Sequence, residues 1–246
     1  MGVALVLLSL VLLMPRLMDY QAAEAEFESY GHLVESSGAS YSEADGEVSF
    51  SELEVPEVDI EAARVEVSPE TVAWIEIPKT RVSYPVVQGE DNRYYVRRSP
   101  SGPRRSSGSI FMDYKNNPDI SQNRNTIIYG HNMRNGSMFA AVPKYSSQSY
   151  LKAHQVVYYT DEHSTYTIRI IGAYITNGSD QSVRQFDFVD EAHFQSYLDQ
   201  QMSRTVSRID VDTSEVTQIV QLSTCSYSIR DGRTILIGIV EHVTPR

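Results

Sequence analysis

A single cysteine between two apolar strands is the feature that most constrains this chain. The segments 216–222 (VTQIVQL) and 234–240 (TILIGIV) are β-branched runs typical of strands. Asp231-Gly232 is a turn signal between them. If the two strands pair side by side, Cys225 faces Arg233 across the open end of their connection. A thiol becomes nucleophilic beside a base or a cation, so the pattern predicts a reactive cysteine, provided that other catalytic groups join it.

The net charge of −11 is concentrated near the N-terminus of this 246-residue chain, which is long enough for one full-sized domain with appendages. Residues 19–70 contain fifteen Asp or Glu residues against Arg64 alone, giving −14. Arg16 adds +1, so residues 71–246 carry about +2. We therefore expect no nucleic-acid partner. One cysteine excludes an internal disulfide but does not fix the compartment.

An uninterrupted apolar run, Gly2–Met14, opens the chain. Thirteen residues of helix are about 20 Å long, short of the roughly 30 Å of a bilayer core. Three interpretations compete: a signal peptide, a membrane anchor whose first residues precede this start, and a buried helix. We favour the anchor over residues 1–18, with the body of the protein outside the cytoplasm.

An acidic segment, residues 19–66, follows the apolar run. We expect a helix over Asp19–Ser36 and a Ser/Gly-rich linker over Ser36–Asp45. Most of residues 37–65 read as a solvated spacer between membrane and domain. The predicted catalytic domain is then residues 67–246.

Short strands joined by turns dominate the remainder, which predicts a mainly β fold, a closed barrel with helical additions. Ser68 is expected to cap a short helix over Pro69–Trp74. Arg93–Val96 is expected to be extended, and Pro100–Ser107 is a basic loop. One long helix is predicted over Asp190–Arg204 from its apolar spacing. The predicted strands are Trp74–Ile77, Val82–Val87, Ser109–Met112, Asn125–Tyr129, Val156–Thr160, Tyr166–Tyr174, Thr217–Leu222 and Thr234–Val240.

A histidine stands where another buried strand ends. Asn125–Tyr129 breaks at Gly130, which places His131 on the rim of the sheet. A lone histidine at a strand end is usually a surface residue, but Cys225 and Arg233 also stand at strand ends. Together they form a minimal acyl-transfer set of nucleophile, proton shuttle and fixed cation.

At these residues the chain resembles the sortases, extracytoplasmic cysteine transpeptidases of Gram-positive bacteria, and class B in particular. The resemblance covers roughly residues 67–243. One departure is Gln221, where the family usually has Thr. The matching segments, in order, are VAWIEIP (72–78), YPVVQ (84–88), GSIFMD (108–113), YGHNM (129–133), GSMF (136–139) and LSTC (222–225), with an arginine eight positions later.

The resemblance implies an eight-stranded barrel with N-terminal helices and a long helix before the cysteine strand, where 190–204 lies. It also implies transpeptidation through a thioacyl enzyme. Cys225 would attack a carbonyl of a C-terminal sorting motif. His131 would protonate the departing amine and then deprotonate the incoming one. Arg233 would hold the motif's carbonyl, the oxyanion, or both.

Several further residues match positions that line the class B motif groove. Asn92, Tyr129, Ser223 and Thr224 are the main candidates for substrate binding, and Tyr174 and Ile175 are weaker ones. Each also has a purely structural interpretation, as turn residue, core aromatic or strand residue. Asp113 would orient the nearby loop or cap a turn. The histidines show no metal-ligand spacing, so we expect no metal and no cofactor.

The partners implied are secreted proteins with a sorting motif and an amine acceptor, either the peptidoglycan precursor lipid II or a pilin lysine. A papain-like protease is disfavoured, because its cysteine precedes the histidine and opens a helix. A non-catalytic, membrane-tethered wall-binding barrel is also disfavoured, because it does not need cysteine, histidine and arginine at three strand ends.

Overall fold

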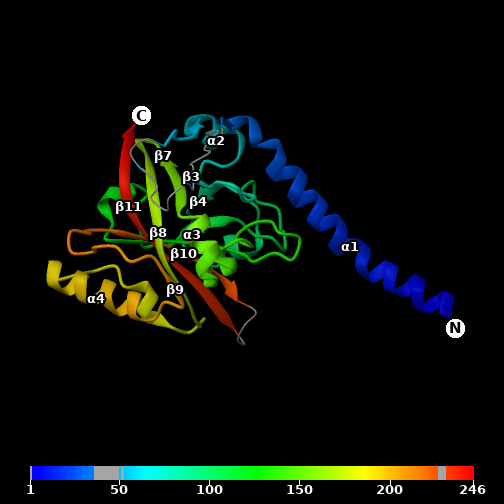
Figure 1. Ribbon diagram of the computed structural model, residues 1–246. Coiled ribbons are helices and arrows are strands. Elements are labelled where there is room, and N and C mark those ends of the chain that lie inside the picture. The colour runs from blue at the N-terminus through cyan, green and yellow to red at the C-terminus, as the bar shows by residue number, and fades with distance from the viewer. Residues whose placement is uncertain (1, 36–49, 51–52, 227–230) are drawn as a thin grey trace.

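The computed structural model describes residues 2–35, 50, 53–226 and 231–246, and its centre is a closed barrel of strands (Figure 1). Each barrel strand overlaps one of the predicted strands. The barrel strands are β3 (Thr71–Ile77), β4 (Val82–Val87), β5 (Ile110–Met112), β6 (Asn125–Gly130), β7 (Val156–Asp161), β8 (Ser164–Asn177), β10 (Ile219–Ser226) and β11 (Gly232–Pro245).

The ring runs β11-β10-β6-β5-β4-β3-β7-β8 and closes because β8 also pairs with β11. Most pairs are antiparallel, whereas β4–β5 and β6–β10 are parallel. A two-residue strand, β9 (Ser207–Arg208), adds to β8 outside the ring. Closure leaves no long unpaired edge. The predicted eight-stranded mainly β barrel is therefore confirmed.

Both faces of the strands near the cysteine are covered. Ile128 and Leu222 lie in the barrel core, whereas Ile127 and Ile235 belong to a second cluster on the outer face. Strands buried on both faces read as continuous apolar runs rather than alternating ones. This explains the run 234–240 that the sequence shows.

The helix predicted over 190–204 is present as α4 (Glu191–Ser203), and it covers that outer face (Figure 1). Asp190 caps it by accepting a hydrogen bond from the His193 N–H at 2.8 Å. Phe194 and Leu198 are fully buried against the barrel. The α4 helix therefore acts as an outer wall that closes one side of β6 and β10.

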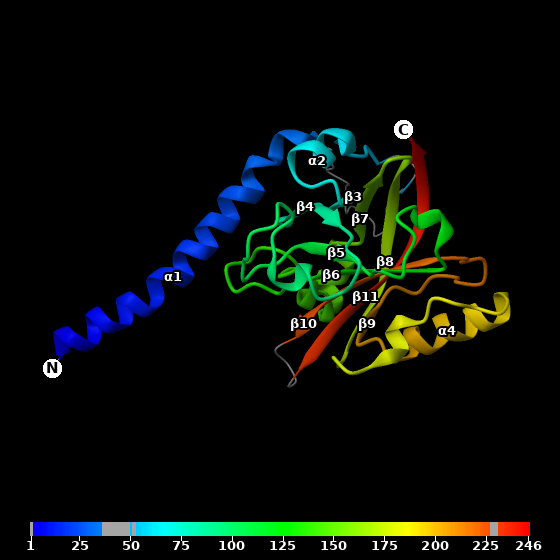
Figure 2. The ribbon, with the colours of Figure 1, turned by 180° about the vertical axis from the view of Figure 1, so that it is seen from behind.

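Residues 2–29 form one continuous helix, α1 (Gly2–Ser29), although the sequence predicted a separate helix from Asp19. The helix extends away from the barrel toward the N-terminus (Figures 1 and 2). Its last turns dock on the barrel, where the Phe27 ring packs edge-on against Tyr84 at 5.1 Å and Glu24 pairs with Arg81. Among the described residues, no helix is long and apolar enough to span a membrane.

The solvated spacer predicted for residues 37–65 is wrong for its C-terminal part. The helix α2 (Ile60–Glu66) packs on the barrel, with Ile60 and Ala63 buried in a cluster with Trp74. Strands β1 (Val34–Glu35) and β2 (Glu57–Val58) pair beside it. The acidic residues between these apolar positions concealed the packing face. The linker predicted over Ser36–Asp45 lies outside the described residues.

The short helix predicted after Ser68 is also wrong, because Thr71–Ile77 is strand β3. Pairing with β4 on one side and β7 on the other satisfies its main chain. Two pairing partners outweigh a local capping signal. The sequence did not indicate α3 (Gln148–Ala153) or the short 3₁₀ segments η1 (Gly31–Leu33), η3 (Tyr95–Arg97), η4 (Ile120–Gln122), η5 (Val142–Ser146) and η6 (Gln181–Arg184).

Candidate active site

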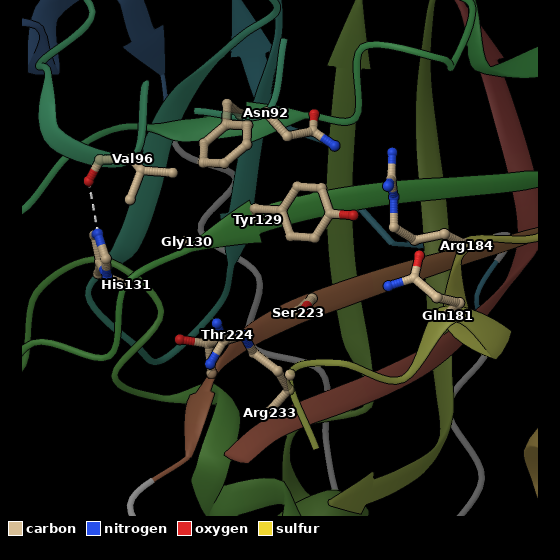
Figure 3. A pocket seen from close by; sticks show the side chains of 12 residues that line it. Asn92, Val96, Tyr129, Gly130, His131, Gln181, Arg184, Ser223, Thr224 and Arg233 are labelled. Carbon is tan, nitrogen blue, oxygen red and sulfur yellow. Dashed lines mark hydrogen bonds between the residues drawn. The ribbon is translucent and has the colours of Figure 1, made fainter. Parts of the chain in front are cut away.

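A cleft of about 300 Å³ opens where β6 and β10 end (Figure 3). Its walls come from the barrel strands, the η3 and η6 segments and the loop after β8. The lining residues are Asn92, Val96, Phe111, Tyr129, Gly130, His131, Gly178, Gln181, Arg184, Ser223, Thr224 and Arg233.

The strand register brings the three predicted catalytic residues to this end of the barrel. Cys225 on β10 pairs with Arg233 on antiparallel β11. Thr224 pairs with Gly130 on parallel β6, so His131 follows directly at the adjacent strand end. The Cys225 side chain itself lies outside the described part of the structure. Its backbone lies on strand β10. A papain-like protease would instead have its cysteine at the start of a helix.

Gly130 is required by the crowding beneath it. A Cβ at this position would lie 2.4 Å from Ile110 Cδ1 and 2.7 Å from Phe139 Cδ2. Only glycine lets the β6 backbone pass over these buried side chains. The close approach fixes where the chain leaves the strand, and thereby the starting point of His131.

The His131 ring is held by a backbone carbonyl. Its Nε2 lies 2.7 Å from the Val96 carbonyl oxygen (Figure 3). A carbonyl only accepts, so this nitrogen carries hydrogen and proton exchange falls to Nδ1. Val96 belongs to η3 (Tyr95–Arg97), and Tyr94 before it also has a helical backbone, so the extended conformation predicted for Arg93–Val96 is wrong. The tight turn aims the Val96 carbonyl at the histidine.

The Val96 carbonyl leads to a first prediction, on Gly108→Ala. Gly108 has φ +56°, and a Cβ there would lie 2.5 Å from the Val96 oxygen. The added methyl will displace the carbonyl that holds His131. We expect turnover in the cysteine-dependent reaction to fall about 10- to 100-fold, the scale of a misplaced catalytic group. Steady-state kinetics across pH will check this, because a loosened His131 alters the pH profile as well as the rate.

Gly102→Ala is the matched control for this prediction. Gly102 has φ +109° and faces open space, where an added Cβ would meet nothing within 4 Å, so the variant carries backbone strain without touching Val96. Equal losses of turnover in the two variants would contradict a positioning role for Gly108. An unaltered pH profile in Gly108→Ala would contradict it too.

Arg233 presents most of its guanidinium to the cleft. Its Nη1 donates to the Gly232 carbonyl at 3.0 Å and to Asp231 Oδ1 at 3.4 Å. Its side chain is 35% exposed, and within the described residues Nε and Nη2 have no hydrogen-bond partner. The planar fork therefore retains donors that a ligand carbonyl or oxyanion can use.

Asp113 is the buried hub of the opposite wall. Its Oδ2 accepts from Asn92 Nδ2, the Tyr129 hydroxyl and Arg184 Nε, each at 2.8 Å. Its Oδ1 accepts from Arg184 Nη2 at 3.2 Å and from the Lys115 N–H at 3.1 Å. The carboxylate thus orients two of the predicted substrate-binding residues, Asn92 and Tyr129, and joins them to η6.

These donors outweigh burial in setting the pKa of Asp113. Burial alone would raise the pKa of Asp113. The hydrogen bonds from Arg184, Lys115, Tyr129 and Asn92 lower it by more than burial raises it, so the net pKa is below its ordinary value. The pKa of Tyr129 is raised by its own burial and by the adjacent carboxylate. At neutral pH the wall is therefore a carboxylate–guanidinium pair with a neutral phenol.

A second prediction concerns Asp113→Asn, which leaves the partly buried Arg184 without its counterion. We expect a loss of unfolding free energy of about 3 kcal/mol at pH 7, measured by urea denaturation. Because the folded pKa is depressed, the Asp113 contribution is full above the unfolded pKa of about 4 and fades as pH falls below it. As pH falls below about 4, the unfolding free energy of the variant will therefore decrease less than that of the wild type.

Asp210→Asn provides the control, because Asp210 is exposed and has no ion pair within the described residues. It should change the unfolding free energy by less than about 0.5 kcal/mol. If Asp113→Asn is as mild, Asp113 is not the structural hub of the cleft.

Two other predicted substrate-binding residues, Ser223 and Thr224, also line the cleft. Ser223 pairs with Tyr129 across the parallel strands, so the two occupy neighbouring positions on the cleft floor. The Thr224 hydroxyl oxygen is buried, so a peptide would meet the rest of that residue rather than its oxygen.

Tyr174 and Ile175 do not lie in the cleft. Tyr174 is fully buried and donates its hydroxyl hydrogen to Gln201 of α4 at 2.6 Å. Ile175 pairs with Thr234, farther along the sheet from β6. The helix α4 covers Tyr174, so this residue is not accessible to a substrate.

Several residues that line the cleft were not predicted as site residues: Val96, Phe111, Gly178, Gln181 and Arg184. Arg184 and Gln181 lie on η6, in a segment without strand or helix periodicity. A lone basic residue in such a segment carries no signal of its partner. The position of Asp113 after a strand was the one signal in the sequence that a cationic partner such as Arg184 would lie nearby.

Gln221, the departure from the family pattern, is buried and donates to the Tyr197 hydroxyl at 2.8 Å. Asn125 Nδ2 also donates to that hydroxyl, at 3.1 Å, and Tyr197 donates to the Val183 carbonyl at 3.0 Å. The network ties β10 and β6 to α4 and η6. Gln221 therefore supports the wall of the cleft rather than its floor.

Comparison with known proteins agrees with this fold. A sortase-domain family model matches residues 75–239, so the chain belongs to the sortase family, the cysteine transpeptidases. Its relatives place it in class B. Sortase B of Listeria monocytogenes is 34% identical over 169 residues, which is 68% of each chain.

Similar solved structures include two sortase B enzymes. Sortase B from B. anthracis matches with a TM-score of 0.74 and 29% identity, over 94% of this chain and all of that one. The Staphylococcus aureus sortase B–substrate complex matches with a TM-score of 0.67 and 30% identity, over 74% of this chain and 83% of that one. The sortase prediction, including class B, is confirmed.

Proposed function

We propose that this transpeptidase cleaves a C-terminal sorting motif of secreted proteins and joins the acyl fragment to an amine of the peptidoglycan precursor, anchoring proteins to the cell wall. The observation that carries the proposal is the register of three strand ends. It sets Cys225 opposite Arg233 and one strand away from His131. The S. aureus relative was solved with a substrate, which supports a peptide ligand here.

The proposed reaction has two halves. The Cys225 thiol passes its proton to His131 Nδ1, and its sulfur attacks the motif carbonyl. The carbon–nitrogen bond then breaks, and the departing amine takes that proton from Nδ1. The thioacyl carbonyl is then attacked by the acceptor amine, whose proton returns to Nδ1 as the thiolate leaves. Nε2 remains bonded to Val96 throughout. Arg233 donates to the oxyanion in both halves, the role in which fixed donors contribute most.

The cleft walls support a peptide-binding role. Asn92 and Tyr129 are fixed by Asp113 on one side, and Ser223 lies beside Tyr129 on the floor. An extended motif in the cleft meets amide, phenol and hydroxyl groups held by the barrel. We propose these residues, with Thr224, as the motif-binding surface.

We further propose that the apolar run Gly2–Met14 attaches the enzyme to the cell membrane, with its catalytic domain outside the cytoplasm. Met14, Leu17 and Met18, at the end of this run and just after it, are large apolar side chains exposed on α1. A long apolar segment followed by a docked acidic stretch favours attachment over burial within the protein.

The test is a peptide-library cleavage assay with the full chain in non-ionic detergent. Products are identified by mass spectrometry in the presence of two competing acceptors, a peptidoglycan stem-peptide amine and a lysine peptide. We expect motif-dependent cleavage with the amide formed to the stem peptide. Exclusive transfer to lysine would favour a pilin-polymerising enzyme. The absence of any cleaved peptide would favour a binding barrel instead.

A further inference from the structure

A cluster of arginines beside the cleft is not used by the proposed chemistry. Residues 93–105 contain five arginines and no acidic residue, within a chain of net charge −11. Positive charges at this density repel one another and destabilise the folded chain unless an anionic ligand binds to them.

The cluster forms a pocket of about 420 Å³. An isolated bridge pairs Arg98 with Arg104 across a hairpin whose turn holds Gly102 at φ +109°. Like charges directly opposite one another on paired strands are destabilising. Arg98 is fixed by donating to the Gly102 carbonyl at 2.8 Å and by lying 4.8 Å from the centre of the Tyr94 ring. The lining residues are Asp91, Arg93, Tyr94, Val96, Arg97, Arg98 and Arg104.

The charges in this pocket are not neutralised. Arg93, Arg97 and Arg104 are exposed, and none has an ion pair within the described residues. Arg105 differs, because it turns away to Glu26 at 3.7 Å. The one acid present, Asp91, is occupied by the main-chain N–H groups of Arg93 and Tyr94. Four arginines against one aspartate leave the pocket a net charge of about +3.

A phosphate group is the ligand that fits best. Guanidinium groups bind phosphate oxygens in bidentate pairs, and arginine is the preferred residue for that purpose. Four arginines line the pocket, more than one phosphate monoester needs. A diphosphate diester spreads its two negative charges over two phosphoryl groups and can therefore contact more of them. Val96 lines both this pocket and the catalytic cleft, so the two adjoin.

The pocket also lies at the base of α1. Ser106, next to the hairpin, donates its N–H to Asp19 of α1 at 3.0 Å, and Ser101 donates its hydroxyl hydrogen to Glu26 at 2.6 Å. Asp19 is five residues, or about 7.5 Å of helix, from the end of the apolar run at Met14. The loops after β4 lie on the side of the barrel toward which α1 extends (Figure 2). A ligand phosphate at a membrane surface is therefore within reach.

We infer that the arginine pocket binds the diphosphate of a lipid-linked amine acceptor and thereby recruits that acceptor beside the cleft. The inference rests on the proposed function, because it concerns the acceptor of the same transfer. It selects an acceptor carried on a membrane diphosphate over a protein lysine, which bears no such group.

The experiment titrates the full chain in non-ionic detergent with inorganic pyrophosphate by calorimetry. We expect saturable binding that weakens with salt. Arg97→Gln with Arg104→Gln will weaken it about 100-fold, about tenfold for each lost charged contact. The control pair, Lys152→Gln with Arg208→Gln, removes the same charge from exposed positions on α3 and β9 and will change affinity less than about threefold.

Asp91→Asn supplies a test in the opposite direction. Asparagine keeps an oxygen for the two N–H groups but removes the negative charge from the pocket. Pyrophosphate affinity will rise several-fold, which damage to the fold cannot mimic. Unchanged or weaker binding by Asp91→Asn, or equal losses in the two double variants, would overturn the inference.

Two further arms identify the source of the phosphate. Geranyl diphosphate will compete with pyrophosphate far better than phosphatidylglycerol in mixed micelles; equal competition would assign the pocket to phospholipid headgroups instead. A wild-type chain that cleaves sorting peptide but binds no pyrophosphate refutes the pocket alone. One that binds pyrophosphate but cleaves no peptide refutes the proposed function alone.

Discussion

Cys225→Ala will eliminate both cleavage and transfer of a sorting peptide while leaving the fold intact. The thioacyl intermediate needs the sulfur, and no other cysteine exists in the chain. Cys225 lies one residue before the end of β10, where a smaller side chain should cost little packing. Turnover of a fluorogenic peptide will fall to background, and the thermal unfolding midpoint will stay within a few degrees of wild type.

Ser226→Ala is the neighbouring control, and it should retain most of the activity. Labelling with a methanethiosulfonate reagent gives an independent check, because it should inactivate the wild-type chain in step with modification of one thiol. Full-rate turnover by Cys225→Ala would exclude this residue as the nucleophile.

Arg233→Lys will lower kcat/KM by about two orders of magnitude, the effect of removing one oxyanion donor. A lysine retains the charge but is a point charge without the planar fork. Among the described residues, Nη1 is the one Arg233 nitrogen that bonds to the turn, at Gly232 and Asp231. Lysine cannot replace the other donors of the guanidinium, and this is the cause of the expected loss. The loss should fall mainly on kcat, because the oxyanion exists only in the transition state.

Arg169→Lys is the matched substitution on β8, where Arg169 pairs with Glu241 away from the cleft. It should change kcat/KM by less than about threefold. If Arg233→Lys retained nearly normal kcat, Arg233 would be a surface charge rather than part of the reaction. If it raised KM alone, the residue would bind the motif without stabilising the oxyanion.

Much of the architecture is encoded locally. The β-branched runs specify the eight strands, because such side chains fit a sheet that is buried on both faces. The spacing of Phe194 and Leu198, with Asp190 ahead of them, marks the helix α4 and its start. The sequence predicts Cys225, His131 and Arg233 as site residues because each lies next to the end of an apolar strand.

The tertiary structure decided which of these elements meet. The parallel pairing of Thr224 with Gly130 carries His131 to the cysteine strand, and no local pattern encodes a parallel register between distant strands. The same applies to Arg184 and Asp113, whose bond joins η6 to the end of β5. The sequence marks each as charged, but not as a partner of the other.

The errors have the same origin. Tyr174 was a reasonable groove residue until α4 was placed over it, and α2 was a reasonable spacer until its apolar face met Trp74. Periodicity tells which face of an element is apolar, because that depends only on the residue spacing within it. What covers that face, and which side chains remain open to a substrate, depends on long-range packing, which only the folded chain determines.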